Sequence, residues 1–185
     1  MTMGTNNNTG LQYKRKVATL TVEVALKKKN YKRLADLIEL ADKYGVRKSL
    51  RAKGWKETGM YWQREGHHPD AIIALNAARA LQPTNTKTLS ALFFSFQEFI
   101  SKFRDTFSTE DLDSMLDQVH RLLEFYKAQK MWDSPAIEIG KQIYRRINYL
   151  KIDAKSAVET PATHKVDRIV KALRENVTMD EVAAD

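Results

Sequence analysis

The fold is decided by residues 52–85, which read AKGWKETGMYWQREGHHPDAIIALNAARALQPTN. In a helix, one face of the first half of this stretch carries the packing residues Trp55, Thr58, Gly59 and Trp62. Because Gly59 has no side chain, it lets a neighbouring helix approach closely at this face. The stretch therefore predicts a helix that packs tightly against another helix.

Glycine and proline divide the same stretch into two helices. Gly66 supplies the left-handed residue that ends the first helix, and Pro69 suits the first turn of the second. Pro83 then ends the second helix, because proline cannot continue it. We predict a helical hairpin with its turn near Gly66.

This hairpin resembles the tetratricopeptide (TPR) repeat, a helix–turn–helix unit of about 34 residues with the pattern W-x2-L-G-x2-Y, A-x3-F and a closing Pro. The matching residues are Trp55, Thr58, Gly59 and Trp62, then Ala71, Leu75, Ala78 and Pro83. Thr58, Trp62 and Leu75 replace the Leu, Tyr and Phe of the pattern. The resemblance implies a surface that binds another protein.

The chain before this hairpin predicts a second, degenerate one at 14–28 and 31–44. Its second helix carries Leu34, Ile38 and Ala41 in the places of Ala71, Leu75 and Ala78. Alternating apolar residues between 17 and 26 also fit a strand. A lone strand would leave its backbone groups unpaired, so we favour the helix.

Residues 86–107 predict a long helix with a wide apolar face. At 100° per residue, eight residues lie within about 60° of its centre at Phe96: Leu89, Leu92, Phe93, Phe96, Phe99, Ile100, Phe103 and Phe107. Such a face must be covered, so we expect this helix either in the core or at the seam of a homodimer. Phe94 is the exception, at about 160° from Phe96 among polar residues.

The rest of the chain predicts one more hairpin and a terminal helix. Ser108 and Asp111 form a capping box before a helix at 109–130, and Pro135 starts the next helix at 135–151. We expect an all-α fold, either a short TPR-like helical-hairpin solenoid or an irregular helix bundle with a C-terminal capping helix. The expected organisation is a disordered tail at 1–12, a helical domain at 13–151, a linker at 152–162, and a C-terminal helix and tail at 163–185.

The composition indicates a globular protein without recognisable catalytic chemistry. The chain has no cysteine, so disulfides and thiolate metal sites are excluded. It has no apolar run near the ~20 residues that a membrane span needs, and we expect a cytoplasmic location. The four histidines, His67, His68, His120 and His164, lack a zinc-like arrangement of partners. We therefore expect no enzyme activity, no cofactor and no metal site.

The positive charge is concentrated at the start of the chain. The net charge is +8 overall, with +9 in residues 1–68 and −1 in residues 69–185. This asymmetry favours an acidic partner, although a solvated face that keeps the protein soluble explains it equally well. If the partner is nucleic acid, sequence-tolerant phosphate contacts would come from Lys14, Arg15, Lys16, Lys27, Lys28, Lys29, Lys32 and Arg33.

The TPR resemblance instead implies an adaptor or chaperone-type protein with a partner-binding groove. The family's groove positions fall here on Lys53, Lys56, Met60, Gln63, Arg64, Lys87, Ser90, Phe94 and Gln97. Basic residues beside the exposed Phe94 would suit an acidic segment of a partner protein with an apolar anchor. The two functional hypotheses are therefore a protein-binding adaptor and a nucleic-acid-binding protein.

Overall fold

The chain has an all-α fold in the computed structural model, which describes residues 6–154. The helices of this part are α1 (Asn6–Lys27), α2 (Tyr31–Lys43), α3 (Lys48–Arg64), α4 (His68–Leu81), α5 (Thr86–Phe103), α6 (Thr109–Ala128) and α7 (Pro135–Ala154), with a short 3-10 turn η1 (Arg104–Thr106) after α5. No strand occurs between residues 6 and 154, so the helical prediction for 17–26 is confirmed.

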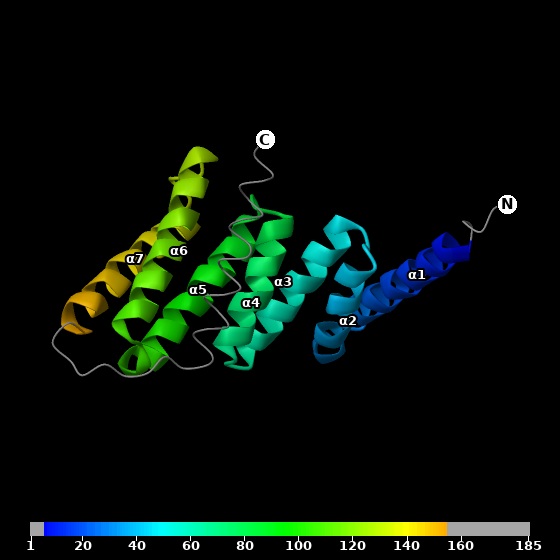
Figure 1. Cartoon of the computed structure of the whole chain (residues 1–185), viewed down its shortest axis with the longest axis horizontal. Coiled ribbons are helices and arrows are strands. Elements are labelled where there is room, and N and C mark those ends of the chain that lie inside the picture. Colours follow the sequence, from blue (N-terminus) through cyan, green and yellow to red (C-terminus); the bar gives the residue numbers. More distant parts are fainter. Residues whose placement is uncertain (1–5, 155–185) are drawn as a thin grey trace.

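The helices stack side by side into an elongated array (Figure 1). The α1 helix lies at one end and the α6–α7 hairpin at the other. From α1 to α5, helices that follow one another in the chain also pack against one another. At the far end this order changes, because the backbone of α7 comes closer to α5 than that of α6 does. Stacked hairpins of this kind bury their apolar faces only against their neighbours.

Four turns between these helices share one backbone geometry. The chain enters the left-handed region, with φ between 53° and 75°, at Lys29, Gly45, Gly66 and Lys130. After Gly66, the N–H of His67 donates to the carbonyl of Trp62 at 2.9 Å, and the other three turns repeat this bond. This pattern is the Schellman motif that ends many helices. Gly66 therefore ends α3 as predicted, whereas two lysines hold the same conformation without the freedom of glycine.

Two glycines let α3 lie close to both of its neighbours. A Cβ atom on Gly54 would overlap the side chain of Ile38 in α2, and one on Gly59 would lie 2.5 Å from Cγ of Leu75 in α4. The two glycines are about 140° apart around the helix. The close approach predicted at Gly59 is confirmed, and α3 is held between α2 and α4.

The buried apolar side chains form two clusters. The smaller cluster joins α1, α2 and the start of α3, through Ala18, Val22, Ala25, Leu34, Ile38, Ala41, Val46 and Leu50. The larger cluster runs from α4 to α7 and contains the phenylalanines of α5. Leu34, Ile38 and Ala41 are buried, as are Ala71, Leu75 and Ala78, so both predicted packing faces are confirmed.

The apolar face of α5 lies in the larger cluster. Six of its members are at most 1% exposed: Leu89, Leu92, Phe93, Phe96, Phe99 and Ile100. Residues of α4, α6 and α7 belong to the same cluster. The core prediction for this face is therefore confirmed, and the alternative of a homodimer seam on it was wrong because one chain already covers it.

Some predicted boundaries differ from the observed helices. Residues 6–12, expected in a disordered tail, are the first turns of α1. No proline interrupts them, and they extend a helix that is already nucleated by the packing of Ala18 and Val22. The helix predicted at 86–107 ends at Phe103, and α7 continues to Ala154, three residues into the expected linker. The capping box of Ser108 and Asp111 is confirmed. The remaining linker and the C-terminal helix and tail lie outside the described residues.

Candidate functional site

Two exposed apolar side chains mark the face predicted from the TPR resemblance. Phe94 on α5 is 48% exposed and Met60 on α3 is 37% exposed. The other phenylalanines in the middle of α5 are buried, so Phe94 lies on the opposite side of the helix from the core. We call the surface formed by these two residues and their predicted neighbours the α3–α5 face.

Gln63 joins the two helices of this face. Its Nε2 donates to the carbonyl of Ala91 at 3.0 Å and to Oγ of Ser95 at 2.8 Å. Ala91 and Ser95 lie on α5 within three residues of Phe94. Gln63 is therefore a tether between α3 and α5, and it fixes how the two helices present their exposed side chains.

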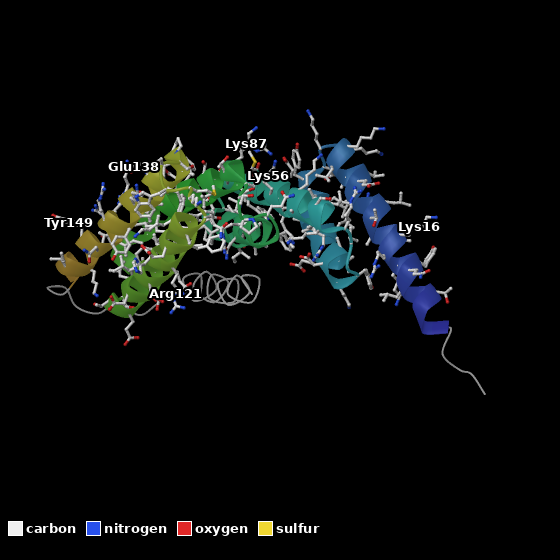
Figure 2. All side chains as sticks on the ribbon, turned by 90° about the horizontal axis from the view of Figure 1, so that it is seen from above. Lys16, Lys56, Lys87, Arg121, Glu138 and Tyr149 are labelled. Atoms are coloured by element: carbon white, nitrogen blue, oxygen red, sulfur yellow. The ribbon has the colours of Figure 1, made fainter. Side chains whose placement is uncertain are left out.

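Basic and polar side chains surround Phe94 and Met60. Lys56 and Lys87 project from the same side of the molecule (Figure 2). Lys56 is partly buried and its Nζ lies 3.2 Å from Oε1 of Glu57, so part of its charge is compensated. Lys87 is exposed, while Ser90 and Gln97 are half-buried on the turns beside Phe94.

The two remaining predicted groove residues lie toward the N-terminal helices. The guanidinium of Arg64 lies 5.2 Å from the ring centre of Tyr31 on α2. Lys53 lines an open hollow between α1 and α3 instead. The structure therefore ties Gln63 to α5, whereas Arg64 contacts α2 and Lys53 lines the hollow beside α1.

A row of aromatic rings beside this face was not predicted. Tyr31 of α2 lies 6.5 Å from Tyr61, Tyr61 lies 4.9 Å from Trp62, and Trp62 lies 5.4 Å from His67, between ring centres. Tyr31, Tyr61 and Trp62 are half-buried. Tyr31 is 30 residues away from Tyr61 in the sequence. No periodicity links them, so only the packing of α2 on α3 reveals the row.

The basic residues of the first third fall into two groups. In the first, Arg15 donates from Nε to the carbonyl of Tyr44 at 2.9 Å, and Nζ of Lys14 lies 6.0 Å from the Tyr44 ring. The second group gathers around the α1–α2 turn and consists of Lys27, Lys28, Lys29, Lys32 and Arg33. The groups are about 20 Å apart along α1. Lys16 is exposed between them on α1 (Figure 2).

An open hollow of about 440 Å³ contains basic residues from both functional hypotheses, nucleic-acid binding and protein binding. It is lined by Glu23, Leu26, Lys27, Arg47, Ser49, Leu50 and Lys53. Lys27 belongs to the predicted nucleic-acid set and Lys53 to the predicted protein-binding set. Arg47, at the start of α3, was in neither set. Three cations and one carboxylate leave this hollow net positive.

The histidines of the α3–α4 turn lie in a structural setting. Burial lowers the pKa of His68 below its ordinary value; Glu98 opposes this shift, whereas Lys102 and His67 add to it. Among residues 6–154, no group of three or more His, Asp or Glu side chains is placed to hold a metal ion. No helix in this range is long and apolar enough to cross a membrane.

Comparison of the chain with models of protein families, with curated proteins and with solved structures finds no match.

Proposed function

We propose that the protein is a non-enzymatic adaptor or chaperone-type protein that binds a segment of another protein on the α3–α5 face. The observation that carries this proposal is the exposure of Phe94, a large aromatic side chain at the centre of an otherwise polar helix surface. Aromatic side chains of this kind are frequent anchors of protein interfaces.

The chemistry of the face favours a partner segment that is both acidic and apolar. Phe94 and Met60 offer apolar contact area, and methionine adapts its shape to different partners. Lys56 and Lys87 supply positive charge on the same side of the molecule. Because charged residues at the rim steer association more than they add affinity, the apolar anchors would hold the segment and the lysines would select it.

The TPR resemblance of residues 52–85 supports the same proposal. In that family the first helices of successive repeats line the binding surface, and here these would be α3 and α5. The tether from Gln63 to Ala91 and Ser95 holds these two helices in a fixed relation. A preorganised surface loses less entropy on binding. The absence of cysteine suits a reducing compartment, and we propose a cytoplasmic location.

The proposal is tested by capturing partners with the full chain and with two single variants. Phe94→Ala removes the proposed anchor, and Tyr149→Ala removes an aromatic side chain that is 66% exposed on α7. We expect a partner that the wild type and Tyr149→Ala capture and that Phe94→Ala loses. A partner captured equally by all three proteins would refute this face as its binding site.

A second candidate function is sequence-tolerant nucleic-acid binding. The observation that favours it is the net positive hollow lined by Lys27, Arg47 and Lys53, close to the basic residues of the α1–α2 turn. Phosphate contacts would give an affinity that falls steeply with salt. Nuclease treatment before capture separates the two functions, because only partners bridged by nucleic acid would then be lost.

A further inference from the structure

The α1 helix exposes a second apolar surface, at the end of the array opposite α6 and α7. Tyr13, Val17, Leu20 and Val24 are between 41% and 70% exposed. Successive members are four, three and four residues apart. Their side chains therefore lie within about 60° of one another around the helix. We call these four residues the α1 stripe.

The α1 stripe is separate from the face that α1 buries. Ala18, Val22 and Ala25 pack into the smaller cluster, and the stripe is centred about 140° away from them. The helix also outreaches its neighbour, since α1 has 22 residues and α2 has 13. Arg15 contacts Tyr44 at the end of α2, so the turns of α1 before it extend past α2.

The spacing and width of the α1 stripe fit a second helix. Apolar residues that alternate four and three apart repeat every 3.5 residues on average, which is the seam of a two-helix coiled coil. Such a seam is narrower than the apolar face of more than 100° with which a helix lies on a core or on a membrane surface. The geometry therefore favours a partner helix over a lipid surface.

A groove continues the stripe at its C-terminal end. It has a volume of about 190 Å³ and is lined by Leu20, Thr21, Val24, Ala25, Lys28, Asn30 and Arg33. A cavity of roughly 150 Å³ already holds a benzene ring. The groove is therefore large enough for one bulky apolar side chain of a helix that lies along the α1 stripe.

The charged residues beside the α1 stripe indicate which charge should flank the apolar seam of the partner helix. Lys28 and Arg33 border the groove on the α2 side. Lys27, Arg47 and Lys53 line the hollow on the α3 side, with Glu23 as its acidic member. A second copy of this chain would bring the same excess of positive charge to the interface, since residues 1–68 carry a net charge of +9. Acidic flanks are complementary to it.

We propose that the α1 stripe docks an amphipathic helix of another protein, in a two-helix coiled coil whose partner carries glutamate or aspartate on both sides of its apolar seam. This surface is distinct from the α3–α5 face, and the inference does not depend on the function proposed for that face. The protein then has two binding surfaces on separate parts of the array.

The test uses the full chain and a synthetic amphipathic peptide. The peptide carries leucine at its seam positions, one phenylalanine for the groove, and glutamate at both flanks. A matched peptide carries lysine at the flanks. We expect the glutamate peptide to bind, with an affinity measured by fluorescence anisotropy, and the lysine peptide not to bind. No binding of the glutamate peptide, or equal binding of both peptides, would overturn the proposal.

Two kinds of variant locate the contact. Leu20→Asp should weaken binding of the glutamate peptide at least tenfold, whereas Leu40→Asp, at an exposed leucine of α2, should leave it unchanged. The double change Lys28→Glu and Arg33→Glu should shift the preference toward the lysine peptide. Circular dichroism confirms that each variant is folded, which the exposure of these side chains leads us to expect. Binding that Leu20→Asp leaves intact would place the peptide elsewhere and overturn the proposal.

The other possible occupants of the α1 stripe are a lipid surface, nucleic acid and a second copy of the chain. Anionic vesicles, duplex DNA and self-association by sedimentation are measured for the wild type and for Leu20→Asp. The proposal is wrong if the wild type does not bind the glutamate peptide but binds vesicles or DNA, or self-associates, and Leu20→Asp abolishes that interaction. The occupant found in this way then takes the place of the acidic helix.

Discussion

A methyl group placed on Gly59 would lie 2.5 Å from Cγ of Leu75 and 3.1 Å from its backbone nitrogen. The α3 and α4 helices therefore meet with backbone against side chain, with no room for a Cβ atom between them. Both residues belong to the hairpin at 52–85 that decides the fold, so this contact is where the sequence pattern becomes a packing constraint.

Gly59→Ala should destabilise the protein by about 1–3 kcal/mol. The overlap with Leu75 outweighs the ~1 kcal/mol that alanine gains in helix propensity, because the backbone of α4 cannot move away independently. Gly10→Ala is the matched control, since nothing lies within 4 Å of a Cβ atom there. It should leave stability unchanged or raise it. Urea denaturation of both variants measures the difference, and equal stabilities would contradict the close contact.

The sequence predicts those parts of the fold that depend on a strong local signal, such as a turn glycine or a helix cap. Gly66 and the Ser108–Asp111 box were found because a left-handed turn and a helix cap need those residue types. The left-handed turn at Lys130 was not predicted, because lysine gives no sign of that conformation. The packing of α7 against α5 depends on contacts between distant residues, such as Gly140 with Phe93.

Helix periodicity likewise predicts one part of the candidate site. Phe94 stood out because helix periodicity alone separates it from the other phenylalanines of α5. Other contacts depend on which helices become neighbours. Arg64 contacts Tyr31 on α2, and Gln63 contacts Ser95 on α5. A single sequence carries no periodic signal for such contacts, so the sequence predicts neither the ring contact of Arg64 nor the tether of Gln63.

The two phenylalanines Phe96 and Phe94 should differ sharply in their contribution to stability. Phe96 is fully buried, so Phe96→Ala should cost about 3–5 kcal/mol of unfolding free energy through lost burial and the cavity that remains. Phe94→Ala should change stability by less than about 0.5 kcal/mol. Thermal and urea unfolding of the two variants measures the contrast. A large loss for Phe94→Ala would show that this side chain supports the core.

Lys130→Gly should stabilise the protein by about 0.5–1 kcal/mol. Lys130 has a φ of 58°, a conformation that glycine adopts without the steric cost of a Cβ atom. Gly66→Ala is the opposite change at an equivalent turn, with a φ of 75° and no atom near the added Cβ. It should lose about 1 kcal/mol. If urea unfolding showed that Lys130→Gly destabilises the protein, the Schellman geometry at this turn would be wrong.

The stability of the protein should fall as the pH drops below about 6.5, in part through His68. Burial lowers the pKa of His68 in the folded state, so the unfolded chain takes up the proton first and acid favours unfolding. His68→Gln should remove this part of the pH dependence, while His120→Gln, on the exposed side of α6, serves as control. Melting temperatures between pH 5 and 8, compared for the three proteins, provide the measurement. A wild type and a His68→Gln variant with the same pH profile would exclude His68 as a source.

Binding of a partner on the α3–α5 face is tested most directly with the wild type, Phe94→Ala and Tyr149→Ala. Calorimetry measures the affinity of a captured partner for each protein, and the melting temperature of each protein is measured alongside. We predict that Phe94→Ala weakens binding by more than about 1 kcal/mol, a factor of about five, and leaves the melting temperature unchanged. Tyr149→Ala should change neither quantity. A Phe94→Ala variant that binds as tightly as the wild type, or that melts at a much lower temperature, would contradict the α3–α5 face as the site of partner binding.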